Sequence, residues 1–205
     1  MRLFVGVAIS MESVRAVAAV AEAMRAAAGP EGPPVRWVPP ASYHVTLKFL
    51  GEARSEVVPA LRDAVGEALA GEGPFTFRAR GAGAFPALDR ARVLWVGVDD
   101  PEGRLARLAA ACDEAAARLG FRRERRAFHP HVTIGRLRQV ANVESLVLPC
   151  TEQECSDTRA TSVILYESLR KAKGSEYRAR AEWPLRQTSR VEPTPTNTSQ
   201  PPGRS

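Results

Sequence analysis

Two hydrophobic periodicities alternate along most of the chain. Apolar residues recur every three or four positions in three stretches, which predicts amphipathic helices over about 11–28, 55–70 and 101–119. A weaker pattern of the same kind predicts a short helix near 143–147. Runs that are β-branched, or that alternate apolar with polar residues, predict eight strands, over 2–9, 35–38, 43–50, 75–80, 93–98, 128–137, 161–169 and 177–183.

Residues that favour helix ends support these boundaries. Ser10 precedes the first helix in the N-cap position, where its hydroxyl can accept a hydrogen bond from a free backbone N–H, and Gly29-Pro30 ends this helix. In the third helix, Asp100 is the expected cap and Pro101 falls in the first turn, where proline is well tolerated. The sequence thus predicts where both of these helices begin.

The order of the predicted elements favours the α+β class. Helices and strands alternate, but strands follow one another directly in 75–98 and in 161–183. This order is typical of antiparallel or mixed sheets with helices on one side. No G-x-G-x-x-G or P-loop sequence follows a strand, so neither a dinucleotide-binding fold nor a P-loop nucleotidase is supported.

Composition divides the chain into a folded part and a tail. Residues 187–205 are mostly Ser, Thr, Pro, Gln and Asn, so we expect a disordered tail there. Residues 1–186 are enough for a single domain. No stretch approaches 18 consecutive apolar residues, and the first nine residues follow a strand pattern instead of a secretion signal. We therefore expect a cytoplasmic protein without a membrane partner.

The charge balance is basic. The chain has 29 Lys and Arg against 23 Asp and Glu, a net charge of +6. An anionic partner fits this excess, but Arg-rich and Ala-rich chains are often basic without binding nucleic acid, so both interpretations stay open. Cys112, Cys150 and Cys155 are odd in number and lack the companions of a zinc site, so we expect reduced thiols.

Two of the three histidines occur in matching motifs. These motifs are His44-Val45-Thr46-Leu47 and His131-Val132-Thr133-Ile134, and 87 residues separate the two histidines. The spacing is close to half of the folded length, which indicates an internal duplication with one motif in each half. In a strand, the His and the Thr of each motif point to one face and the apolar residues to the other. If the halves face each other, two imidazoles and two hydroxyls converge in one cleft.

Such a cleft suits displacement at phosphorus. One imidazole, neutral, accepts a proton from the nucleophile, and the other, protonated, donates a proton to the leaving oxygen. The hydroxyls of Thr46 and Thr133 can donate hydrogen bonds to the non-bridging phosphate oxygens. Beside these motifs the sequence lacks the carboxylates and further histidines of a two-metal phosphatase, so we expect neither a metal nor a cofactor.

With both motifs intact, the sequence resembles the two-histidine (2H) phosphoesterases. It is most similar to their bacterial and archaeal branch, the RNA 2′,3′-cyclic phosphodiesterases formerly called 2′-5′ RNA ligases. The similar segments are Arg2–Val5, His44–Gly51, Pro130–Arg136 and Leu165–Ser168. The resemblance implies a bilobal α+β fold, with two pseudo-symmetric lobes of antiparallel or mixed sheet, helices outside and a central groove.

The resemblance also implies an activity. By position, His44 is the proton donor and His131 the proton acceptor in hydrolysis of RNA 2′,3′-cyclic phosphodiester ends to 2′-phosphomonoesters. The implied partner is RNA with such ends, for example tRNA fragments, and we expect a monomer. The alternatives are 2′-5′ RNA ligation, cleavage of small cyclic nucleotides or 2′-5′ oligonucleotides, and, from another class, a non-catalytic RNA-binding module.

Strand parity ranks the residues after each motif. Lys48 shares the parity of the first motif and is a candidate for contact with RNA or phosphate, although a solvated lysine fits equally well. Phe49 has the opposite parity and is expected in the core. Arg136 has the wrong parity for the groove unless Gly135 allows a β-bulge. The resemblance nevertheless makes Arg136 a candidate phosphate ligand.

Three further features are candidates for the groove. His129 shares the parity of His131 and is expected at most to line the groove, since Pro130 between them can distort the strand. Tyr166 is a candidate for contact with the substrate, with a buried aromatic as the alternative. The basic run Arg122–Arg126 is a candidate for RNA backbone contact, with a solvated charged face as the alternative.

Overall fold

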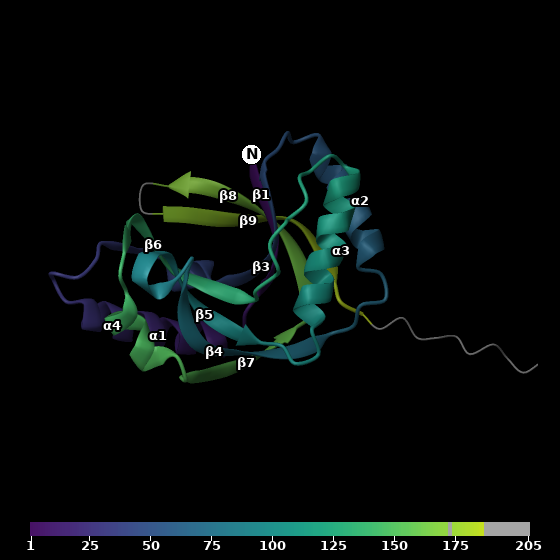
Figure 1. Cartoon of the computed structure of the whole chain (residues 1–205). Helices are drawn as coiled ribbons and strands as arrows, with labels where there is room; N and C mark the ends of the chain where they lie inside the picture. The colour runs from purple at the N-terminus through teal and green to yellow at the C-terminus, as the bar shows by residue number, and fades with distance from the viewer. Residues whose placement is uncertain (172–173, 187–205) are drawn as a thin grey trace, which may run out of the picture.

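A computed structural model describes residues 1–171 and 174–186 of the chain. In Figure 1, α1 and α4 lie together at one end of the molecule and α2 and α3 at the other, with strands between them. The helices are α1 (Met11–Ala28), α2 (Val57–Ala68), α3 (Arg104–Arg118) and α4 (Glu144–Val147). The strands are β1 (Arg2–Ala8), β2 (Val35–Trp37), β3 (His44–Glu52), β4 (Phe75–Phe85), β5 (Ala91–Asp99), β6 (His131–Ala141), β7 (Glu154–Ala160), β8 (Ser162–Lys171) and β9 (Gly174–Pro184).

The strands form one antiparallel sheet of two lobes. Their order is β7-β4-β5-β6-β3-β1-β8-β9, and β2 pairs with β6 outside this path. Strands β7 to β6 of this order make one lobe, and strands β3 to β9 make the other. The lobes meet where β3 pairs with β6, at the partner residues Val45 and Val132. The α+β class and the bilobal fold with outer helices, expected from the sequence, are confirmed.

Helices α1 and α3 interlock the two lobes. Strands β1 and β3 are joined through α1, and β5 and β6 are joined through α3. Each helix packs on the lobe opposite the strand that precedes it, because α1 follows β1 and contacts β7, and α3 follows β5 and contacts β3. Their inner faces are fully buried, as Val17 and Met24 of α1 and Leu105 and Leu108 of α3 illustrate. The crossed packing places both lobes on one hydrophobic core.

The predicted start of helix α1 is correct, and the predicted start of helix α3 is wrong. The Ser10 hydroxyl accepts a hydrogen bond from the Ser13 N–H at 3.1 Å, which confirms the N-cap of α1. However, α3 begins at Arg104, because Pro101 lies in a turn that precedes it. The Asp100 carboxylate still reaches the first turn of α3, where it accepts a hydrogen bond from the Leu105 N–H at 2.7 Å.

Several strands differ from their predicted extents. Strand β7 was not expected, because its polar sequence, Glu154–Ala160, lacks the usual apolar alternation; as an edge strand, it is half exposed. Strand β6 begins at His131 and not at Phe128, since Pro130 has no N–H to give to the ladder. Strand β3 continues past Gly51, which adopts a φ of 75°.

Two predictions fall partly or wholly outside the described residues. The expected tail, 187–205, lies outside them, and so does Lys173 in the expected link between the last two strands. Within the part of the chain that the structure describes, no helix has the length and apolar character needed to span a membrane.

Candidate active site

The pairing of β3 with β6 places the two motifs side by side. Val45 is the direct partner of Val132 in this antiparallel pair, and both valines are fully buried. Antiparallel register therefore sets His44 opposite Thr133, and Thr46 opposite His131. Because side chains alternate, these four polar residues share the face opposite the core. Three of the four, His44, Thr46 and Thr133, also line the adjacent cavity, whereas His131 is not among its lining residues.

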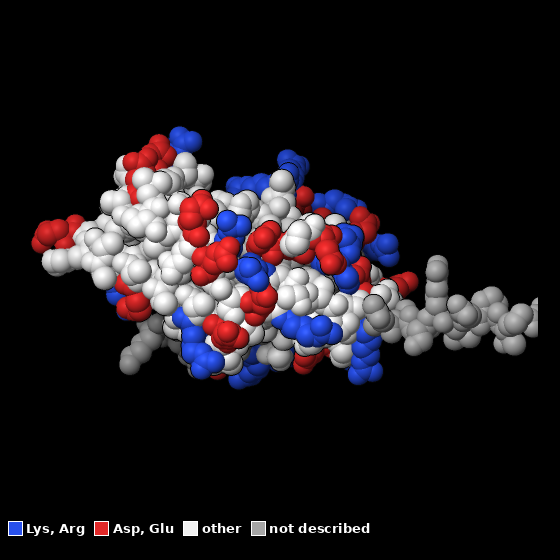
Figure 2. Space-filling model, turned by 90° about the horizontal axis from the view of Figure 1, so that it is seen from below, with Lys and Arg blue, Asp and Glu red and all other residues white. Residues whose placement is uncertain are grey.

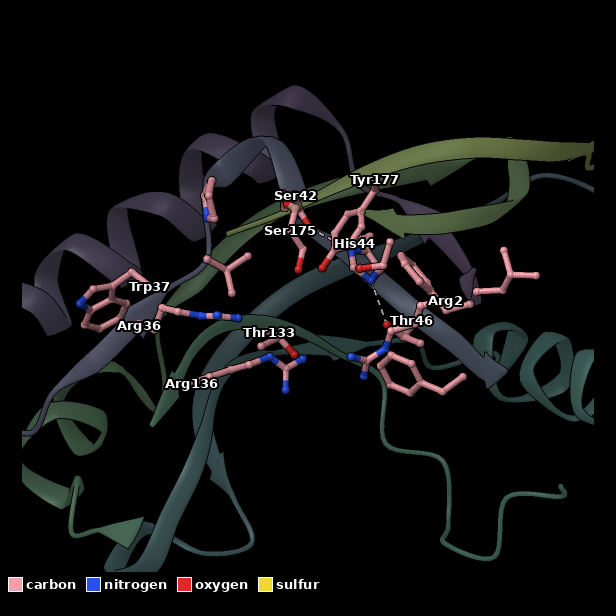
Figure 3. Close-up of a pocket in the computed structure, with 16 residues that line it drawn as sticks. Arg2, Arg36, Trp37, Ser42, His44, Thr46, Thr133, Arg136, Ser175 and Tyr177 are labelled. Atoms are coloured by element: carbon pink, nitrogen blue, oxygen red, sulfur yellow. Dashed lines mark hydrogen bonds between the residues drawn. The ribbon is translucent and has the colours of Figure 1, made fainter. Parts of the chain in front are cut away.

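A cavity of about 400 Å³ opens beside this seam. Residues of β1, β2, β3, β6, β8 and β9 line it, and Figure 3 shows His44 and Thr46 from one lobe gathered with Thr133 and Arg136 from the other. Four of the predicted residues are among them, His44, Thr46, Thr133 and Arg136. The cavity is thus the central groove expected between the lobes.

Backbone carbonyls hold both imidazoles in the same way. The Nδ1–H of His44 donates to the carbonyl oxygen of Ser42 at 2.8 Å, and that of His131 donates to the carbonyl oxygen of His129 at 2.7 Å. Since a carbonyl can only accept, Nδ1 carries the proton and Nε2 has the free lone pair in each neutral ring. The Nε2 of His44 accepts a hydrogen bond from the Thr46 hydroxyl at 2.9 Å. Both Nε2 atoms are therefore available for proton transfer.

Aromatic rings fix the orientation of each imidazole. The ring of His44 stacks on Phe4 with centroids 4.7 Å apart and meets the edge of Tyr177 at 5.1 Å. The ring of His131 meets Phe85 edge-on at 5.0 Å. These contacts exclude water from one side of each ring and limit its rotation.

Burial in this setting keeps both imidazoles neutral. Loss of hydration lowers the pKa of His44 to about 4, opposed by its hydrogen bond to Ser42 and reinforced by His131 and Arg136. Loss of hydration also lowers the pKa of His131, opposed by its bond to the His129 carbonyl and reinforced by the charges of His129 and Arg136. In the free protein at neutral pH, each Nε2 is consequently a base.

A β-bulge in β3 reverses the predicted roles of Lys48 and Phe49. Val5 of β1 pairs with Lys48 and the next residue pairs with Thr46, so Leu47 is an extra residue in β3. Beyond the bulge, the faces exchange: Lys48 is only 5% exposed, whereas Phe49 is 58% exposed and lines the cavity. The prediction of Lys48 in the groove and that of Phe49 in the core are both wrong.

Lys48 is a structural residue on the core side. Its ammonium donates hydrogen bonds to the Asp113 carboxylate at 2.5 Å and to the carbonyl oxygen of Arg122 at 2.6 Å. The same carboxylate accepts from the backbone N–H of Glu124 at 2.9 Å. Lys48 thus ties the loop that leads to the second motif to helix α3.

Strand β6 carries a bulge at the equivalent position. Trp95 of β5 pairs with Thr133 and its neighbour Leu94 pairs with Gly135, which leaves Ile134 as the extra residue. Gly135 is buried, and the side chain of Arg136 turns into the cavity (Figure 3). The bulge on which the placement of Arg136 depended is present.

Comparison with known proteins now identifies the family. A family model for the 2′-5′ RNA ligase superfamily matches residues 13–171. This chain belongs to that superfamily. An Archaeoglobus fulgidus relative named RNA 2′,3′-cyclic phosphodiesterase is 34% identical over 87% of this chain and 97% of its own. An Aeropyrum pernix relative of the same name is 36% identical over 78% of this chain and 92% of its own.

Solved structures agree with this assignment. E. coli LigT complexed with 3′-AMP has a TM-score of 0.70 and 28% identity, over 90% of this chain and 97% of LigT. A Thermus thermophilus protein has a TM-score of 0.73 and 26% identity, over 92% of this chain and all of that protein. The resemblance to 2H phosphoesterases seen in the motifs is therefore confirmed.

Other predicted residues of this superfamily member lie behind or beside the cavity. Tyr166 stacks on Phe4 with centroids 5.1 Å apart, lies 6.0 Å from the His44 ring, and is not among the residues that line the cavity. His129 is exposed and lies before β6; its carbonyl oxygen contacts His131, while its ring lies 5.0 Å from that of Trp95. The second motif of the superfamily is thus supported by the backbone of His129.

The basic run has partial ion pairing. Residues Arg122–Arg126 form an exposed loop between α3 and β6. Arg123 pairs with Glu114 at 2.6 Å, and the Glu124 carboxylate accepts hydrogen bonds from the N–H groups of Arg125 and Arg126. This run lies outside the lining of the cavity.

Sequence reasoning missed most of the residues that line the cavity, among them two arginines and a tyrosine. Arg36 and Tyr177 line it, and so does Arg2, which entered only as part of a similar segment. Arg36 stands in a three-residue strand whose partner, β6, is about a hundred residues away along the chain. The exposure of Phe49 could have been predicted from the repeat. If Gly135 allows a bulge after the second motif, the first motif is expected to have a bulge at the same position, and that bulge turns Phe49 to the groove.

The donor set gives no sign of a metal centre. In the described ranges, no group of three or more His, Cys, Asp and Glu side chains is placed to hold an ion. The cavity offers the imidazole of His44, hydroxyls and guanidinium groups, which favour an anionic ligand over a cation.

Proposed function

We propose that this protein hydrolyses the 2′,3′-cyclic phosphodiester ends of RNA to 2′-phosphomonoesters without a metal ion. The observation that carries the proposal is the pairing of His44 and Thr46 with Thr133 and His131 across the β3–β6 seam. In each imidazole Nε2 carries the lone pair that can take up a proton, and in His44 it accepts a hydrogen bond from the Thr46 hydroxyl. The names of the A. pernix and A. fulgidus relatives support the same reaction.

In this mechanism, His131 activates water. Its Nε2 takes a proton from a water molecule, whose oxygen forms a bond to phosphorus. The bond from phosphorus to O3′ breaks in line with the attack, and the Nε2 of His44 gives its proton to the departing O3′. The product has a 2′-phosphate and a free 3′-hydroxyl. The hydroxyls of Thr46 and Thr133 donate hydrogen bonds to the non-bridging oxygens, where charge gathers in the transition state.

Because the pKa of His44 is low, the bound substrate must help to protonate this ring. At neutral pH the buried ring is neutral in the free protein, because its pKa is about 4. A phosphodiester anion beside the ring favours the imidazolium and raises this pKa. The phosphate then replaces the ring as the acceptor for the Thr46 hydroxyl. His44 therefore becomes an acid only when the substrate is bound.

Phosphorus NMR of a short RNA with a cyclic phosphate end tests the reaction. The expected product is a 2′-phosphomonoester, formed equally well in the presence of a chelator. A 3′-phosphate product contradicts the proposed direction of ring opening. Absence of turnover on this RNA and on cyclic mononucleotides favours the non-catalytic RNA-binding alternative.

A better leaving group tests the role of His44. Replacing O3′ by sulfur makes departure without a proton easy, so the His44→Ala variant is expected to regain most of its lost rate on this substrate. The His131→Ala variant lacks the base for water and is expected to gain nothing comparable. Equal rescue of both variants contradicts the assignment of donor and acceptor.

Ligation is the same ring opening at the same groups with another nucleophile. The superfamily name favours it as a second candidate: the 5′-hydroxyl of one RNA attacks the cyclic phosphate of another in place of water. Mixing two such RNAs and following linkage against hydrolysis separates the two. Small cyclic nucleotides and 2′-5′ oligonucleotides are the further substrates to compare. RNA fragments such as those of tRNA as natural partners, a monomeric state and a cytoplasmic location remain predictions.

A further inference from the structure

Three arginines face the cavity beyond the two motifs. Arg36 of β2, Arg136 of β6 and Arg2 of β1 all line it, and Figure 3 shows Arg36 and Arg136 extending toward Thr133. None of the three has an ion pair or a side-chain hydrogen bond with any residue that the structure describes. None of the described residues that line the cavity is acidic. The arginines therefore form a positive cluster with free donors.

The positions of Arg36 and Arg136 make this cluster unusual. The two residues are direct partners in the antiparallel β2–β6 pair. Like charges directly opposite one another destabilise a sheet. Loss of hydration, followed by the charges of Arg36 and Arg2, lowers the pKa of Arg136, while Tyr177 raises it. No acidic side chain among the described lining residues offsets the repulsion, so an anion bound between these strands would relieve it.

Some arginines elsewhere in the described part of the molecule have acidic partners. Figure 2 shows a face on which basic and acidic residues are intermixed. Along the edge formed by β4 and β7, Arg78 pairs with Asp157 at 2.6 Å and Arg80 with Glu152 at 3.6 Å. The cavity differs from this face in that its described lining includes three arginines and no acidic residue.

A single cyclic phosphate is too small a ligand for this cluster. It carries one negative charge, and the two motifs already offer the Thr46 and Thr133 hydroxyls to its oxygens. Three guanidinium groups supply three positive charges and up to about fifteen N–H donors between them. Strands β2 and β3 pair with the same edge of β6, so Arg36 and Arg136 lie four residues along β6 from the Val45–Val132 pair of the seam. The spare charge is therefore displaced along the groove from the reacting phosphorus.

The geometry points to a second phosphate subsite, formed by Arg36 and Arg136 with Arg2. It binds the phosphodiester on the 5′ side of the terminal nucleotide, so the enzyme selects oligonucleotide ends over cyclic mononucleotides. Guanidinium groups suit this role because they hold phosphate oxygens through paired N–H donors. This inference rests on the proposed function and adds the class of substrate to it.

Three substrates isolate the charge of that second phosphate. They are adenosine 2′,3′-cyclic phosphate, the dinucleotide ApA with a cyclic phosphate end, and the same dinucleotide with an uncharged methylphosphonate linkage. The wild-type kcat/KM is expected to be roughly tenfold or more higher for the charged dinucleotide than for either of the others. In Arg36→Gln this preference is expected to fall roughly tenfold, as for loss of a hydrogen bond to a charged group.

A matched control separates the subsite from general electrostatics. Arg15 is exposed on α1 and does not line the cavity, and Arg15→Gln removes the same charge. For this variant, the ratio of kcat/KM on the charged dinucleotide to kcat/KM on the cyclic mononucleotide is expected to equal that of the wild type. Arg36→Lys keeps the charge but loses the paired donors, so an intermediate ratio is expected.

Two results would overturn the subsite. If the methylphosphonate dinucleotide is as good a substrate as the charged one, the second nucleoside and not its phosphate is recognised. If Arg36→Gln and Arg15→Gln give equal ratios, the preference does not come from this cluster. Calorimetry with the 2′-phosphate products gives the same comparison without turnover. An inactive wild type then counts against the proposed function alone, whereas equal affinities for the charged and uncharged products count against the subsite.

Discussion

At the scale of single residues, the two imidazoles share one mode of support. Each Nδ1–H donates to the carbonyl of the residue two positions before it, which is Ser42 for His44 and His129 for His131. This arrangement sets the same tautomer in both rings. Their chemical roles must then differ through their surroundings, of which the Thr46 hydroxyl bonded to His44 is one. The identity of both histidines was predictable from the repeated motif, but their low pKa values depend on rings contributed by other strands.

The depressed pKa of His44 makes stability depend on pH. In the unfolded chain the imidazole has an ordinary pKa near 6.5, against about 4 in the folded protein. The unfolded chain therefore takes up a proton first, and stability is full above pH 6.5 and declines as the pH falls toward 4. Between pH 7.5 and pH 5 the free energy of unfolding is expected to lose about 2 kcal/mol through this residue.

Urea unfolding at a series of pH values measures this loss. The His44→Gln variant removes the titrating group, so its stability is expected to change less over the same range. Parallel curves for the variant and the wild type would show that the buried ring does not titrate as described.

At the scale of elements, the two bulges decide what faces the groove. Strict alternation places Lys48 in the groove and Phe49 in the core, and the extra residue Leu47 exchanges them. A bulge leaves no clear mark in the sequence except where a glycine accompanies it, as Gly135 does in β6. Sequence periodicity thus predicted most helices and strands, while β7 was missed because its polar edge lacks a pattern. Arg36 was missed because the β2–β6 pairing joins distant segments.

The bulge of β6 makes Gly135 difficult to replace. A Cβ atom on Gly135 would lie 2.7 Å from Cγ1 of Val35, which is closer than such atoms approach. Gly135→Ala is therefore expected to lower the free energy of unfolding by about 1–3 kcal/mol and to shift the Arg136 side chain from its position in the cavity. Chemical denaturation and the kcat/KM on cyclic-ended RNA measure the two effects.

A second substitution distinguishes a clash from a conformational requirement. Val35→Ala removes the atom that the new Cβ meets, so the double variant is expected to be more stable than Gly135→Ala alone. If the double variant is no better, the cost comes from the backbone of the bulge and not from the contact with Val35.

At the scale of the whole molecule, the lobes depend on each other. Helix α1 packs on β7 of the opposite lobe, and α3 packs on β3. The Ser13 hydroxyl at the start of α1 also accepts a hydrogen bond from the Thr158 hydroxyl of β7 at 2.8 Å. Neither lobe can lose its packing without exposing the core of the other. We therefore propose that residues 1–186 fold as a single domain.

Calorimetry of the whole chain tests this dependence. One unfolding transition is expected, with equal calorimetric and van't Hoff enthalpies, because the crossed helices couple the lobes. A matched probe is Val17→Ala in α1, which opens a cavity under one lobe and is expected to shift the entire transition. Two separate transitions, of which Val17→Ala moves only one, would contradict the single domain.

The central claim is that the two motifs form one metal-independent active site for cyclic phosphate ends. The most direct test follows an RNA oligonucleotide with a 2′,3′-cyclic phosphate by phosphorus NMR, with chelator present, for the wild type, His44→Ala and His131→Ala. The wild type is expected to give the 2′-phosphomonoester, and each variant is expected to be slower by about 10²–10⁴-fold, as for loss of a general acid or base. Undiminished turnover in either variant, or loss of the wild-type reaction in the chelator, would contradict the account.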